Sequence, residues 1–183
     1  MCTSGVFMEL GTDMLGGRYG LKADINDPFG VCINQKERVK YNCYGQMNAV
    51  LNWAAEGSLS KEAEFVEKIQ NNDLAQETMK TIIGTKTDIA EKLSDYLEIC
   101  RSIQARLHLA CIRGLALAVM TNGTPDEEYR EVIDVCTQPI MNKEERGACL
   151  DFSLKYLQGL YTSWHIKEIC SNAGEKYKNL MCE

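Results

Sequence analysis

Nine cysteines, distributed along a chain of 183 residues, constrain the fold of this protein more than any other feature. Long and short intervals between them alternate, and the short intervals measure 11, 11, 13 and 12 residues. A regular framework of this kind is typical of disulfide-bonded proteins from oxidising compartments. We expect disulfides from Cys2, Cys32, Cys43, Cys100, Cys111, Cys136, Cys149 and Cys170, with Cys182 left as a free or intermolecular thiol.

Apolar residues around the cysteines recur at the spacing of an α-helix. No segment shows sustained alternation with a period of two, so we expect little or no β-sheet. The pattern therefore predicts an all-α protein. The four clearest apolar stripes are Val39, Cys43, Met47, Val50 and Ala54; Ile89, Leu93, Tyr96, Leu97 and Cys100; Tyr129, Val132, Ile133 and Cys136; and Cys149, Phe152, Tyr156, Leu157 and Leu160.

Helix-capping signals recur along the chain. An Asn followed three residues later by a Glu can satisfy the free backbone N–H groups of a first helical turn. A Thr-Pro pair with a Glu at the third helical position also predicts a helix start. We expect helices to begin at Asn34 with Glu37, at Asn142 with Glu145, at Asn172 with Glu175, and at Thr124 with Pro125 and Glu127.

The disulfide pairing can be argued from the geometry of helical hairpins, in which residues equidistant from the turn lie opposite each other. The midpoints of the four long intervals fall on typical turn residues, as at Gly16-Gly17. The alternative pairing closes the short intervals. If residues 100–111 formed one helix, their cysteines would lie about 16 Å apart, and a disulfide needs roughly 7 Å, so that alternative requires a sharp turn near Ser102. We favour the pairs Cys2–Cys32, Cys43–Cys100, Cys111–Cys136 and Cys149–Cys170.

These pairs predict disulfide-bridged antiparallel helical hairpins, stacked as a short, irregular, solenoid-like α-repeat in a single domain over residues 1–183. One unit is longer than the others, and we expect it to contain inserted helices at about 60–70 and 73–83. The glycine-rich residues 11–31 are expected to be irregular. The expected units are 1–32, 43–100, 111–136 and 149–170, with a partial unit from 172.

Composition excludes some classes of function. A net charge of -6 argues against nucleic acid, whose binding needs a Lys/Arg-rich face. The longest apolar stretch, residues 114–120, is too short for a membrane span. The first ten residues lack the basic start of a secretory leader. The cysteines nevertheless indicate an extracellular or periplasmic protein whose leader is absent from this sequence, or a cytoplasmic one if they prove reduced.

No catalytic, cofactor-binding or metal-binding motif stands out. Only two histidines occur, His108 and His165, and the cysteines are too widely spaced for a typical zinc site. We assign both histidines packing or surface roles, and predict no cofactor. Four aromatic residues could line a recognition surface, although aromatics at helical spacing are more often core: Trp53, Tyr156, Tyr161 and Trp164.

The first functional hypothesis is an exported binding or scaffold module that recognises a protein or peptide through its helical surface. Disulfides without a catalytic constellation favour that interpretation. Two alternatives stay open. One is a carrier of a small apolar ligand, held in a cavity between hairpins, and the other is an enzyme with a pocket in the 43–100 insertion. The oligomeric state does not follow from the sequence.

Overall fold

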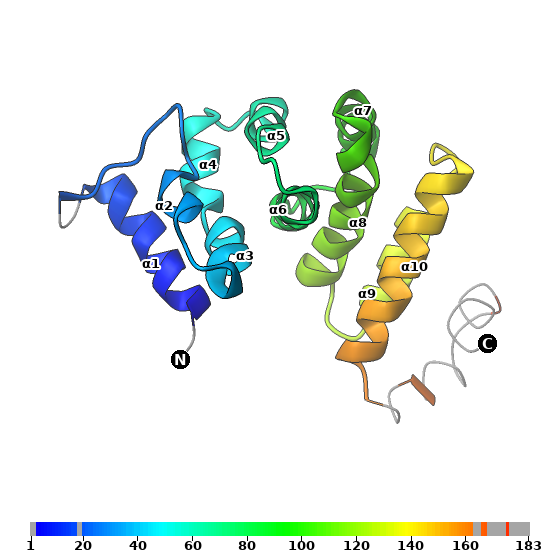
Figure 1. Cartoon of the computed structure of the whole chain (residues 1–183). Coiled ribbons are helices and arrows are strands. Elements are labelled where there is room, and N and C mark those ends of the chain that lie inside the picture. The colour runs from blue at the N-terminus through cyan, green and yellow to red at the C-terminus, as the bar shows by residue number, and fades with distance from the viewer. Residues whose placement is uncertain (1–2, 18–19, 163–165, 168–174, 176–183) are drawn as a thin grey trace.

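The computed structural model describes residues 3–17, 20–162, 166–167 and 175, and across these residues the chain is helical with no β-strand (Figure 1). The predicted all-α class is therefore confirmed. The helices are α1 (Thr3–Gly16), α2 (Gly30–Ile33), α3 (Glu37–Gln46), α4 (Asn48–Ala54), α5 (Leu59–Glu67), α6 (Asn72–Gly84), α7 (Leu93–Ser102), α8 (Ala105–Asn122), α9 (Glu128–Cys136) and α10 (Lys143–Leu160).

Five helices succeed one another across the molecule, with α1 packed on α3, α3 on α6, α6 on α8 and α8 on α10 (Figure 1). The shorter helices α7 and α9 also pack on α8, so α8 has neighbours on most of its sides. Its sequence fits that position, because small and aliphatic residues from Leu107 to Met120 are buried nearly all round the helix. The stacking of these helices as a repeat array stays a prediction.

The contact between α6 and α8 depends on glycine. A Cβ added at Gly114 would lie 2.5 Å from the Cβ of Ile83 and 2.8 Å from the carbonyl oxygen of Lys80. A Cβ added at Gly84 would lie 2.6 Å from Leu117. The two helices can approach this closely only because these two positions have no side chain.

The three disulfides in the described residues close the short intervals, so the favoured long pairing is wrong. They join Cys32 to Cys43, Cys100 to Cys111 and Cys136 to Cys149, with Cα atoms 5.5–5.6 Å apart. Cys2, Cys170 and Cys182 lie outside the described residues.

The short pairing is possible because, in each of these three bridges, a helix ends at the first cysteine or shortly after it, before the second cysteine. Between Cys100 and Cys111, α7 stops at Ser102, and the next two residues have extended ψ angles of 169° and 135° before α8 begins. The required turn near Ser102 is therefore present. In all three bridges the second cysteine is the seventh residue of its helix, at the same height in α3, α8 and α10. Each bridge thus links two consecutive helices covalently across the turn that joins them.

One predicted helix start is confirmed and two are wrong. Asn142 begins α10 with a complete capping box, in which its side chain accepts from the N–H of Glu145 and its own N–H donates back to Glu145. Asn34 instead ends α2, and α3 begins at Glu37 after Lys36. Residues 125–127 form a turn ahead of α9, with Asp126 at a φ of 68°, which a helix cannot contain. The predicted start at 172 lies outside the described residues.

The inserted helices exist, as α5 and α6, and their N-caps are Ser58 and Asn71. The expectation of irregular structure over 11–31 is wrong at both ends, because α1 continues to Gly16 and α2 starts at Gly30. Gly11 serves packing: a Cβ there would touch Met47 at 3.4 Å. It marks where α1 meets the corner between α3 and α4.

Candidate functional site

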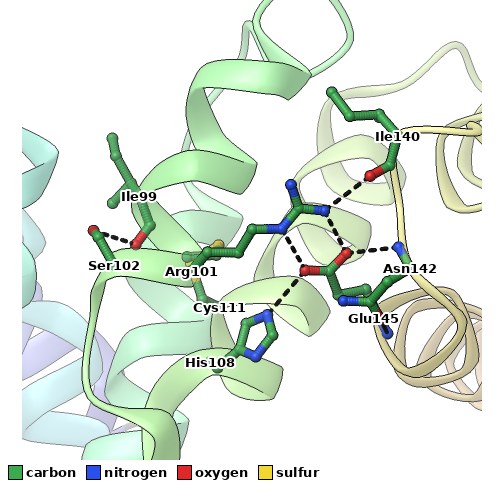
Figure 2. Close-up of polar contacts among 9 residues, drawn as sticks. Ile99, Arg101, Ser102, His108, Cys111, Ile140, Asn142 and Glu145 are labelled. Carbon is green, nitrogen blue, oxygen red and sulfur yellow. Dashed lines mark hydrogen bonds and ion pairs between the residues drawn. A yellow bond between two sulfur atoms is a disulfide. The ribbon is translucent and has the colours of Figure 1, made fainter.

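A buried carboxylate lies where α7, α8 and α10 meet. The side chain of Glu145, fully excluded from solvent, accepts hydrogen bonds from the Nε and a terminal nitrogen of Arg101, both at 2.7 Å. The backbone N–H of Asn142 donates to it at 2.8 Å, and His108 Nε2 lies 3.1 Å away. Figure 2 shows these groups converging on the carboxylate from α7, α8 and the start of α10. We call this set the Glu145 centre.

The electrostatics of the Glu145 centre favour the ionised acid. Hydrogen bonds from Arg101 lower the pKa of Glu145 to about 2, and they outweigh burial, which opposes ionisation. The same bond raises the pKa of Arg101. A buried charge is tolerated when its hydrogen bonds are satisfied, and removing one partner is strongly destabilising. The centre therefore behaves as a clamp between helices.

The neighbouring disulfide positions two members of the centre. Arg101 follows Cys100 directly, and His108 lies three residues before Cys111 on the same helix. The bridge therefore holds the α7–α8 corner in the geometry that brings both side chains to Glu145. His108 was assigned a packing or surface role, and it is part-buried in this centre. His165 lies outside the described residues.

Arg101 also holds the chain that connects α9 to α10. Its terminal nitrogen donates to the carbonyl oxygen of Ile140 at 2.8 Å, as Figure 2 shows. Ile140 and the preceding Pro139 form one edge of a groove of about 880 Å³. The remaining lining residues are Ala90, Glu91, Leu93, Ser94, Val119, Glu131, Asp134, Val135 and Gln138. We call this hollow the acidic groove.

The acidic groove combines an apolar floor with a negative rim. Leu93, Val119 and Val135 are mostly buried beneath it, whereas the side chain of Ile140 stays 46% exposed at its edge. Its lining includes the carboxylates of Glu91, Glu131 and Asp134, and none of the described lining residues is Lys, Arg or His.

One carboxylate of the rim is held in place by the chain. Glu131 accepts from the backbone N–H and the hydroxyl of Thr124, at 3.2 and 2.8 Å. These bonds tie the turn before α9 to that helix and fix the position of the charge. The groove is therefore built from an ordered wall, a clamped edge and an apolar floor, a combination suited to binding.

The predicted recognition aromatics do not come together. Trp53 is 45% exposed on α4, far from α10 in Figure 1. Tyr156 is half-buried on α10, and Tyr161, just after α10, is 7% exposed with its hydroxyl donating to Glu128. Trp164 lies outside the described residues. Trp53 therefore does not share a groove with the two tyrosines.

Over the described part of the chain, no cluster of three or more His, Cys, Asp or Glu side chains is arranged to hold a metal ion. The same residues include no helix with the length and apolar character needed to span a membrane.

Sequence reasoning missed the acidic groove and identified only part of the Glu145 centre. The capping box was a local signal for Glu145 and Asn142. Arg101 gave no such signal, because it meets Glu145 across 44 residues of sequence. Comparison with known proteins found no matching family model, curated protein or solved structure.

Proposed function

We propose that this protein is a binding module for a partner protein, and that the acidic groove receives a basic, amphipathic peptide segment of that partner. The observation that carries the proposal is the combination of three carboxylates with an apolar floor and no lining cation among the described residues. Lysine or arginine on such a segment would complement the rim, and its apolar side chains would cover Ile140 and the floor below it.

The disulfides support export to an oxidising compartment, because three bridges in one chain are compatible with such a location. We place the protein in the extracellular space or the periplasm. Recovery of the natural protein from the cytosol with reduced cysteines would contradict this location, and non-reducing mass spectrometry of that material is the test.

A synthetic pair of peptides tests the groove. One carries leucines on one helical face and lysines beside them, and the other replaces every lysine with glutamate. Fluorescence anisotropy of labelled peptides with the full chain should show binding of the basic peptide only. Because the rim is charged, the affinity should fall as salt is raised from about 50 to about 300 mM. Equal binding of both peptides, or of neither, would contradict the proposal.

Two substitutions locate the binding. Ile140→Lys places an ammonium on the apolar edge and leaves the carbonyl bond to Arg101 available. It should weaken binding of the basic peptide by roughly tenfold or more, because the apolar contact is lost and the added ammonium repels the lysines of the peptide. Ile25→Lys is the matched control, since Ile25 is also 46% exposed but lies outside the groove. An equal effect of both variants would place the peptide elsewhere.

A further inference from the structure

A second hollow lies at the other side of the molecule, between the loop that precedes α2 and the corner that joins α5 to α6. Its volume is about 400 Å³, within the range of small-molecule sites. It shares no residue with the acidic groove. Its walls are largely apolar and include Phe29, Ile33, Phe65, Ile69 and Leu74. We call this hollow the Tyr44 cleft, after the residue that gives it a polar group.

Tyr44 is a buried side chain with an unused hydrogen-bonding group. It is 6% exposed, and its ring stacks on Phe29 with centroids 4.8 Å apart. No group among the described residues hydrogen-bonds to its hydroxyl, which is not sealed from solvent, and Tyr44 is one of the residues that line the cleft. Burial also raises the pKa of Tyr44, so the hydroxyl stays protonated and can donate at neutral pH.

The rim of the cleft carries charges of both signs. Lys68 lies over the Phe65 ring, 4.7 Å from its centroid, and no carboxylate within the described chain pairs with its ammonium. The Asp27 carboxylate likewise accepts no hydrogen bond from the described residues. Lys40 pairs with the exposed Glu37 at 3.0 Å and keeps donor capacity toward the cleft. Lys40 and Asp27 both act electrostatically on the Tyr44 hydroxyl, in opposite directions.

We propose that the Tyr44 cleft binds a small zwitterionic molecule with a large apolar body, the simplest being an amino acid with an aromatic side chain. Its carboxylate would accept from the Tyr44 hydroxyl and the neighbouring lysines, and its ammonium would face Asp27. Its ring would lie among Phe29, Phe65 and the aliphatic wall, where aromatic contacts add to apolar burial. The balanced rim disfavours a ligand with one charge only.

Three probes test the head group: L-phenylalanine, 3-phenylpropionate, which lacks the ammonium, and phenethylamine, which lacks the carboxylate. Titration calorimetry with the full, oxidised chain should give saturable binding of L-phenylalanine. Each singly charged probe should bind roughly tenfold more weakly, the effect of one lost charged hydrogen bond. Absence of L-phenylalanine binding at millimolar concentration, or equal affinity for all three probes, would overturn the proposal.

Substitutions assign the contacts. Tyr44→Phe removes a hydroxyl that has no partner in the described structure and keeps the stacked ring, so the fold should survive. It should weaken L-phenylalanine roughly tenfold, whereas Tyr41→Phe, outside the cleft, should change nothing. Asp27→Asn should remove the preference for L-phenylalanine over phenylpropionate. Unchanged binding of L-phenylalanine by the Tyr44 variant would refute the assignment. If the acidic groove proved not to bind a basic peptide, the proposal for the Tyr44 cleft would be unaffected, because the two hollows share no residue.

Discussion

At the scale of single residues, the Glu145 carboxylate is the buried charge on which three helices depend. Its contacts come from Arg101, His108 and the backbone of Asn142. Glu145→Ala leaves Arg101 without its carboxylate partner, and breaking a buried pair costs about 3–5 kcal/mol. We expect a loss near the lower figure, because Arg101 is partly exposed and can be rehydrated. Urea unfolding measures it, and the exposed Glu91→Ala should stay within about 0.5 kcal/mol of the parent.

The same residue predicts an acid-dependent loss of stability. Its pKa falls from 4.5 to about 2 on folding, chiefly because Arg101 donates to it. The unfolded chain therefore binds a proton at a higher pH than the folded chain does, and the stabilisation disappears as the pH drops from 4.5 toward 2. The free energy of unfolding of the parent should approach that of Glu145→Ala across this window. A difference between them that stays constant down to pH 2 would contradict the assignment.

At the scale of helices, the α6–α8 contact is where adding one methyl group should reduce the free energy of unfolding most. Gly114→Ala puts a Cβ within 2.5 Å of Ile83 and against the backbone of α6. We expect a loss of about 1–3 kcal/mol from overpacking, despite the better helix propensity of alanine. Thermal or urea unfolding measures it.

Gly147→Ala on α10 is the matched control for that prediction, because an added Cβ there meets nothing within 4 Å. The control should gain up to about 1 kcal/mol, the helix preference of alanine over glycine. Equal changes in the two variants would show that propensity, and not the distance between α6 and α8, decides the outcome.

Local patterns predicted the helices well and their boundaries less well. The apolar stripes and the capping box at Asn142 act within a few residues, so sequence sufficed for both. The prediction of irregular structure was wrong for residues 11–16 because a glycine can serve either of two purposes, and the sequence does not distinguish them. Gly11 permits a close helix contact, whereas Gly17, at a φ of 66°, permits a turn. Only the neighbouring helix distinguishes them.

At the scale of the molecule, the disulfide pairing and the acidic groove both depend on tertiary arrangement. The expected hairpin turn at Gly159 lies inside α10, and Cys43 and Cys100 are separated by several helices, so equal distance from a turn does not identify the partners. The groove joins residues before and in α7 to residues of α8 and α9 and to the chain that follows α9. The individual residues show no common pattern, since the rim acids Glu91 and Asp134 resemble any other surface acids until the helices bring them together.

The spacing of the three described bridges predicts a fourth. Their cysteines are 11, 11 and 13 residues apart, and Cys170 and Cys182 are separated by 12. If the corner motif recurs, peptide mapping without reduction should recover a Cys170–Cys182 peptide beside the three others, leaving Cys2 unpaired within the chain. A Cys149–Cys170 peptide would refute both the fourth bridge and the described pairing.

The energetic role of a corner bridge can be measured at Cys100–Cys111. Replacing both cysteines with serine opens a loop of 11 residues, and the chain-entropy account predicts a loss of about 2–3 kcal/mol. The loss should exceed that of the equivalent Cys32–Cys43 variant, because only the first bridge also positions Arg101 and His108 on Glu145. Adding Glu145→Ala to both variants tests this coupling: the two bridge variants should then lose similar amounts. If the two bridge variants still lost different amounts of stability in the Glu145→Ala background, the bridge and the buried carboxylate would not be energetically coupled.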